Sequence, residues 1–204
     1  MLCPGWNGRA SQYHRLITSL IERGFSVIGI EPPGHGQSSG NHTSILEIAS
    51  LIDTLSKQYD FTGFVGHSAG AIAGFSAIAS DSAFKRAVFI AMPNNSKSLL
   101  FHYCQNMRLN EKTSEALKRH FINIHGEHAF TRTSPEFLCE QVNIPVLLIH
   151  DESDTVVPAS HSQMIADKIQ DSNLFLTRRY GHFRILNAPK VTDKICAFFH
   201  EEIS

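Results

Sequence analysis

One serine has the surroundings that covalent chemistry needs. Ser68 stands in the sequence Gly-His-Ser-Ala-Gly at 66–70, between an apolar run at 61–65 and small residues at 71–79. A G-x-S-x-G sequence between a strand and a helix forms a tight turn that raises the serine hydroxyl above the sheet. Glycine suits the outer positions, because a side chain there would strike the neighbouring strand or helix. Ser68 is therefore a candidate nucleophile, and a purely structural glycine-rich turn is the alternative.

A serine hydroxyl needs a base, and the base needs a group that orients it. Asp151, Glu152 and Asp154 follow a predicted strand at 145–150, and His182 follows the next predicted strand at 173–177. Residues that end neighbouring parallel strands meet at one edge of the sheet. The order serine, acid, histidine is also the order in which enzymes with this turn carry the three groups.

The elements that must position these residues alternate along the chain. Apolar periodicity and turn residues predict helices at 11–23, 44–59, 69–80, 160–170 and 189–203, and strands at 1–3, 25–30, 61–66, 85–92, 145–150 and 173–177. Strands that are apolar throughout, separated by helices, indicate an α/β fold: a mainly parallel sheet of about six strands with helices on both faces. The length fits a single domain spanning 1–204.

Residues 93–142 interrupt this alternation. The segment is polar and helix-prone, with charged residues such as Glu111, Lys112 and Glu115. It follows the strand predicted at 85–92, at the edge where open α/β sheets bind ligands. We interpret it as a small helical cap insertion over the site; a solvated helical excursion without a ligand role is the alternative.

Composition and charge exclude several classes of partner. The chain has 204 residues, a net charge of −1 and 18% charged residues. A near-neutral chain is not expected to bind nucleic acid, and no apolar run reaches the roughly 18 residues of a membrane span. Four scattered cysteines and the absence of a signal-peptide pattern predict a cytoplasmic protein with reduced thiols. The 12 histidines lack zinc-site spacing, so no metal or other cofactor is predicted.

Together these motifs resemble those of the α/β-hydrolase family. Within it, the chain looks most like capped serine esterases and enzymes of the lysophospholipase or monoacylglycerol lipase type. The resemblance runs over almost the whole chain, and its motifs are Gly-His-Ser-Ala-Gly at 66–70, Gly-His-Gly-Gln-Ser at 34–38, Asp154 ahead of Val157-Pro158, and Gly181-His182.

The resemblance implies a role for each candidate residue. Ser68 would be the nucleophile, His182 the base and Asp154 the orienting acid. Asp154 is preferred over Asp151, because the family's acid stands a few residues before a Val-Pro pair like that at 157–158.

Acyl transfer also needs hydrogen-bond donors for the negatively charged oxygen of the tetrahedral intermediate. We expect one donor to be the backbone N–H of Ala69, at the positive end of its helix. The other is expected from the loop after the first strand, as the N–H of Trp6 between the flexible Gly5 and Gly8. Trp6 as a surface or cap-packing aromatic is the alternative.

The remaining histidines are predicted to have structural roles. His67, beside the nucleophile, is expected to point away into packing, and His35 to stabilise its own loop. The histidines of the predicted cap are expected mainly on the solvated surface, and one of them lining the pocket is the alternative; these are His102, His120, His125 and His128.

The expected activity is hydrolysis of small-molecule carboxylic esters. The same fold also allows a thioesterase, amidase, C–C hydrolase or acyltransferase, whereas a serine nucleophile excludes relatives that use aspartate, such as dehalogenases and epoxide hydrolases. A non-catalytic binding protein with a retained pocket is a third class. Covalent labelling by a fluorophosphonate would separate that class from the enzymes.

The first strand is expected to be stunted. Only residues 1–3 precede Pro4, which cannot donate to a sheet ladder. In α/β hydrolases two strands and most of a third normally come before this loop, and Pro4 and Glu31 stand where the family often has His and Asp. The sequence is therefore expected to be an N-terminally incomplete form.

Overall fold

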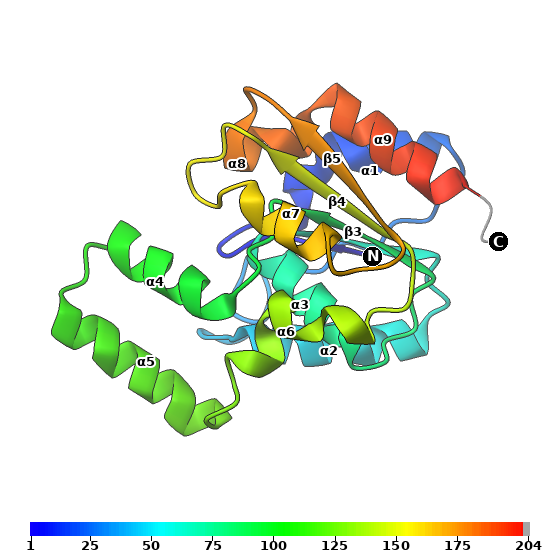
Figure 1. The fold of residues 1–204 in the computed structure, drawn as a ribbon. Helices are drawn as coiled ribbons and strands as arrows, with labels where there is room; N and C mark the ends of the chain where they lie inside the picture. Colours follow the sequence, from blue (N-terminus) through cyan, green and yellow to red (C-terminus); the bar gives the residue numbers. More distant parts are fainter. Residues whose placement is uncertain (202–204) are drawn as a thin grey trace.

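The computed structural model describes residues 1–201 and places a parallel sheet at their centre. Its five strands are neighbours in chain order: β1 (Leu2–Cys3), β2 (Gly63–His67), β3 (Arg86–Ile90), β4 (Val146–Asp151) and β5 (Ser172–Thr177). Helices lie on both sides of this sheet (Figure 1). The expected α/β fold with a mainly parallel sheet is confirmed.

Two layers of apolar side chains attach the helices to the sheet. One face packs against α1 (His14–Glu22) and α9 (Pro189–His200), and the other against α2 (Ile45–Gln58), α3 (Ala69–Ala79) and α7 (Ser160–Ala166). Alternate residues of one strand point into opposite layers: Phe64 packs in the layer with α2 and α3, and Val65 packs in the layer with α1 and α9. Strands buried on both faces need apolar residues throughout, as their sequences show.

Local signals set the helix boundaries. Ser44 caps α2 by accepting the Glu47 backbone N–H at 3.2 Å, and the Glu47 carboxylate accepts the Ser44 N–H in return. Gly24, with φ of 85°, follows the end of α1. The helix expected at 11–23 begins as a 3₁₀ turn, η1 (Ala10–Tyr13). The last helix was expected to reach Ile203, which lies outside the described residues; within them it ends at His200.

The prediction of a strand at 25–30 is wrong, and the described residues form five strands instead of about six. This segment makes one isolated bridge to β1, in which the Leu2 N–H donates to Ile28 O at 2.8 Å and the Ile30 N–H donates to Leu2 O at 2.9 Å. β1 is as short as expected, with two residues. The segment at 25–30 forms no strand because β1, its neighbour, is only two residues long and offers too few backbone partners to pair a full strand.

The segment at 93–142 is helical and divides into two parts. Its first part holds α4 (Ser96–Asn106) and α5 (Glu111–His125), which project from the body of the molecule (Figure 1). Its second part packs against α3 and buries Ala129, Cys139 and Val142 in the main body. The second part contains η2 (Thr131–Thr133), α6 (Pro135–Leu138) and η3 (Cys139–Gln141).

Candidate active site

Ser68 occupies a strained turn between β2 and α3. Its φ of 51° and ψ of −117° lie where non-glycine residues are rarely found. A Cβ on Gly66 would lie 2.7 Å from the Ala71 Cα, and one on Gly70 would lie 2.1 Å from the Pro4 carbonyl oxygen. Both glycines are therefore required sterically, as the sequence predicted. The turn leaves the Ser68 side chain at the carboxyl end of β2.

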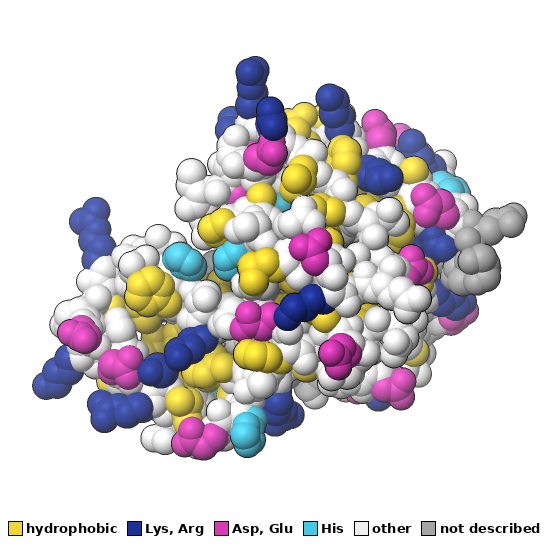
Figure 2. Space-filling view, viewed as in Figure 1, with side chains coloured by type: hydrophobic (Ala, Val, Ile, Leu, Met, Phe, Trp, Pro, Cys, Tyr) yellow, Lys and Arg dark blue, Asp and Glu magenta, His cyan; other side chains and the backbone are white. Residues whose placement is uncertain are grey.

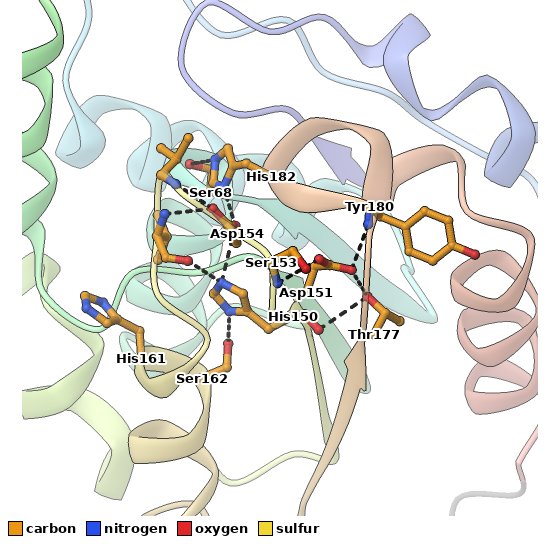
Figure 3. A network of polar contacts seen from close by, with 12 residues as sticks. Ser68, His150, Asp151, Ser153, Asp154, His161, Ser162, Thr177, Tyr180 and His182 are labelled. Atoms are coloured by element: carbon orange, nitrogen blue, oxygen red, sulfur yellow. Dashed lines mark hydrogen bonds and ion pairs between the residues drawn. The ribbon is translucent and has the colours of Figure 1, made fainter.

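The three residues singled out by the sequence meet at this edge (Figure 3). The Ser68 Oγ lies 3.0 Å from His182 Nε2, and His182 Nδ1 lies 2.7 Å from Asp154 Oδ2. Asp154 stands on the loop after β4, and His182 lies in the short helix α8 (Gly181–Arg184) after β5. The imidazole thus lies between a hydroxyl and a carboxylate, and all three side chains are largely withdrawn from solvent.

Asp154 is held as a carboxylate by donors on both of its oxygens. Oδ1 accepts the backbone N–H groups of Val156 and Val157, both at 2.8 Å, and Oδ2 faces the rings of His182 and His150. Burial by itself would raise the pKa of Asp154. Hydrogen bonds from His150, His182 and the Val157 amide outweigh burial and hold that pKa well below its ordinary value.

Asp151, the other acid considered from the sequence, has a different set of partners. Its carboxylate accepts the Thr177 hydroxyl at 2.8 Å, the Tyr180 N–H at 3.1 Å and the Ser153 N–H at 3.0 Å. Burial opposes ionisation, but these hydrogen bonds and that of the Gly181 amide lower the pKa of Asp151 overall. Asp151 therefore fastens the loop that leads into His182 to the end of β4 (Figure 3).

The two residues whose amides are expected to hold an oxyanion are near Ser68: Ala69 follows it directly, and Trp6 lines the same cavity. Ala69 opens α3, and Trp6 lies in the loop after β1. Among residues 1–201, neither backbone N–H has a hydrogen-bond partner. His35 fixes the Trp6 loop, because its Nε2 accepts the Asn7 N–H at 3.0 Å while its Nδ1 faces the Pro33 carbonyl. His35 thus stabilises more than its own loop.

A cavity of about 350 Å³ opens above Ser68. It lies between the Trp6 loop, α4, the loop before α7, and α8. The aromatic and aliphatic residues that line it are Trp6, Leu99, Tyr103, Val156, Val157 and Phe183. His102 of the predicted cap also lines it, which was the alternative to the favoured solvated surface.

His67 does not simply point away from the site. Its ring centroid lies 4.8 Å from that of His182, and its Nε2 donates to the His182 carbonyl oxygen at 2.8 Å. Burial, and next the neighbouring His182, lower the pKa of His67 to about 3. The side chain is buried as expected, but it also anchors the backbone of the candidate base.

Acidification is expected to destabilise the protein through His67. The neutral ring in the folded state has a pKa of about 3, against about 6.5 in an unfolded chain, so the unfolded state binds an extra proton between these values. Stability is full above about pH 6.5 and falls by about 1.4 kcal/mol per pH unit below it. His67→Gln keeps a donor but cannot titrate. Between pH 7 and pH 5, its free energy of unfolding, measured with urea, should therefore fall by about 2 kcal/mol less than that of the wild type. Equal pH dependence in both proteins would contradict this.

The described residues offer no cluster of three or more metal-ligating side chains. No helix within residues 1–201 is both long enough and apolar enough to traverse a bilayer.

Residues 1–123 match a family model, Hydrolase_4, whose description is serine aminopeptidase, S33. The chain belongs to this family of α/β hydrolases. A relative of this chain, the uncharacterized protein YqkD of Bacillus subtilis strain 168, is 21% identical over 179 residues. The match covers 82% of this chain, and the chain spans about 59% of that relative's length.

Solved structures share the fold of this chain. A monoacylglycerol lipase of Paleococcus ferrophilus superposes with a TM-score of 0.75 at 20% identity, over 97% of this chain and 92% of that chain. An esterase of Exiguobacterium antarcticum gives 0.76 at 16% identity, over 98% and 91% of the two chains. The Pyrococcus furiosus esterase Pf2001 gives 0.71 at 18% identity, over 97% and 81%. At these identities the likeness establishes the fold.

Proposed function

We propose that this protein hydrolyses carboxylic esters through an acyl-enzyme intermediate on Ser68. The observation that carries the proposal is the unbroken series of contacts from the Ser68 hydroxyl through His182 to Asp154, at the floor of a cavity. A neutral imidazole at 3.0 Å can take the hydroxyl proton as the oxygen attacks. The carboxylate then stabilises the imidazolium that forms.

Each step of the proposed reaction has a group in place. The Ser68 Oγ bonds to the ester carbonyl carbon, its proton passes to His182 Nε2, and the amides of Trp6 and Ala69 donate to the resulting oxyanion. The leaving alcohol receives the proton from His182. Water, activated by the same imidazole, then attacks the acyl-serine and releases the acid. The proposed reaction requires no metal or cofactor.

The cavity lining favours a neutral substrate over an N-terminal peptide. An aminopeptidase substrate carries an α-ammonium group, and a buried cation needs a carboxylate partner. Within residues 1–201, the side chains lining the cavity above Ser68 include neither Asp nor Glu. The described lining therefore supports an ester more than the aminopeptidase activity in the family's name.

A second cavity supports an apolar acyl group. It has a volume of about 610 Å³ and lies between α4, α5 and the residues before α2. Trp6, Leu99 and Tyr103 line both cavities, so the two share a wall. Hydrophobic side chains gather over α4 and α5 in the space-filling view (Figure 2). We propose that these two helices form the functional part of the cap expected at 93–142, and that they cover the acyl chain.

A panel of p-nitrophenyl esters with acyl chains of two to twelve carbons tests the proposed function, with matching thioesters as the comparison. We expect ester hydrolysis with kcat/KM rising towards medium chains, since each buried methylene contributes about 0.8 kcal/mol. Thioesters hydrolysed far better than esters would favour the thioesterase alternative. Loss of hydrolysis from both series would contradict the proposal.

Filling the second cavity is expected to change chain-length preference. Leu117 of α5 lines that cavity, whereas Ala116 beside it is exposed and does not. Leu117→Trp should lower the ratio of kcat/KM for the decanoyl ester to that for the butanoyl ester by about tenfold, which corresponds to roughly two excluded methylenes. Ala116→Trp introduces the same side chain outside the cavity and should leave the ratio unchanged. If the ratio of decanoyl to butanoyl kcat/KM were the same in both variants, the acyl chain would not bind in the second cavity.

A further inference from the structure

His150 is the penultimate residue of β4 and lies behind the candidate triad, and its ring is completely buried. Its Nε2 lies 2.9 Å from the Val157 carbonyl oxygen and 3.4 Å from Asp154 Oδ2. Its Nδ1 lies 2.7 Å from the Ser162 Oγ, at the start of α7. Figure 3 shows this ring between Ser162 on one side and Asp154 on the other. Both ring nitrogens therefore have partners.

The partners assign the proton on this ring. A carbonyl oxygen can only accept, so Nε2 carries the hydrogen that points towards Val157. In the neutral ring Nδ1 then accepts the Ser162 hydroxyl, and the Nε2–H group also faces the Asp154 carboxylate. Asp154 Oδ2 is the same oxygen that contacts His182 Nδ1 at 2.7 Å. One carboxylate oxygen thus lies between two imidazoles, the nearer being the candidate base.

We propose that His150, oriented by Ser162, is a positioning residue for ester hydrolysis: it fixes Asp154 and the Val157 backbone in the arrangement that aligns His182 with Ser68. This inference rests on the function proposed above and extends its series of contacts to five side chains, from Ser162 to Ser68. The His150 ring contacts the Asp154 carboxylate and the Val157 carbonyl, which lie on the same loop. It thereby holds this loop against the end of β4. Without it, Asp154 would keep its own backbone donors and its N–H would still donate to the Asp151 carbonyl at 3.0 Å, but the loop would lose the side-chain contacts that hold the carboxylate and the Val157 carbonyl.

Two substitutions of similar polarity separate positioning from packing. Glutamine places its amide nitrogen near the position of the histidine Nε2, and asparagine places its polar atoms near Nδ1. His150→Gln can therefore still donate towards Asp154 and Val157, whereas His150→Asn keeps the side facing Ser162 and does not reach Asp154. Two readouts serve both variants: kcat and KM for p-nitrophenyl butyrate, and the rate of Ser68 labelling by a fluorophosphonate.

We expect His150→Asn to lower kcat and the labelling rate by about tenfold to 10²-fold, which is the range for a slightly misplaced catalytic group. KM should change less than about twofold, because His150 does not line the cavity. His150→Gln should stay within about threefold of the wild type in both readouts. Equal losses in the two variants, or wild-type rates in a folded His150→Asn, would overturn the assignment of His150.

Ser162→Ala is a third variant, and it tests the proposal if His150→Asn does not fold. Loss of the hydroxyl frees the ring to rotate, so labelling of Ser68 should slow severalfold while the melting transition stays cooperative. Labelling at the wild-type rate would overturn the proposal. A wild-type protein that neither labels at Ser68 nor hydrolyses esters would overturn the proposed function along with it, so the two failures are distinguishable.

Discussion

Replacing Ser68 by alanine is expected to lower kcat for ester hydrolysis by at least ~10³-fold, by analogy with other triad deletions. The same change should abolish covalent labelling by a fluorophosphonate, whose mass should appear on Ser68 in the wild-type protein. The reason is that the Ser68 hydroxyl contacts the imidazole that can accept its proton. Intact-mass and peptide mass spectrometry measure the label, and a p-nitrophenyl ester assay measures the rate.

Ser98 provides the matched control, because it lines the same cavity from α4. Ser98→Ala should retain labelling and most of the activity. Labelling of another serine, or a Ser68→Ala protein with undiminished kcat, would contradict the assignment of the nucleophile.

Asp154→Asn is expected to give the other large effect, a fall in kcat of roughly 10³–10⁴-fold with little change in fold. An amide can present N–H groups to His182 Nδ1, which favours the imidazole form whose Nε2 carries a hydrogen. That form cannot accept the Ser68 proton. Steady-state kinetics with a short-chain ester measure the loss, and circular dichroism verifies the fold.

Two neighbouring acids serve as controls for Asp154. Glu152→Gln changes an exposed carboxylate paired with Arg178 and should leave kcat nearly unchanged. Asp151→Asn weakens the attachment of the loop before His182 and should reduce activity less than Asp154→Asn does. A larger loss from Asp151→Asn than from Asp154→Asn would reverse the choice of orienting acid.

Most of the fold was predictable because its signals are local. The run Gly-Phe-Val-Gly-His is buried throughout, and the small residues of α3 are required where Gly74 lies against Phe64. The strand expected at 25–30 has the right composition too. The segment does not pair as a strand because β1, its neighbour, is too short. That length is a property of another segment, so residues 25–30 alone could not predict the outcome.

The candidate site was predictable in part. Ser68, Asp154 and His182 stand at turns after apolar runs. Their position after predicted strands, and their order along the chain, predicted that they meet at one edge of the sheet. His67 was expected only to pack, because its contact with His182 joins residues over 100 positions apart. His150 was assigned no role, because its contacts depend on ring orientation. A signal for His150 was present, since a histidine that follows four apolar residues in a buried strand needs hydrogen-bond partners.

The pairing of β1 with β2 also bears on how preparations of this protein should be judged. Cys3 lies opposite Gly66, so the loop that holds Trp6 leaves the sheet beside the turn that holds Ser68. A slip of one residue would displace Trp6 by about 3.3 Å, more than the length of a hydrogen bond, and would exchange the faces of Leu2 and Cys3. Such molecules would retain their helices and a normal circular dichroism spectrum. For refolded material, the active-site titre per mole of protein would therefore report the fraction of molecules that paired this edge correctly.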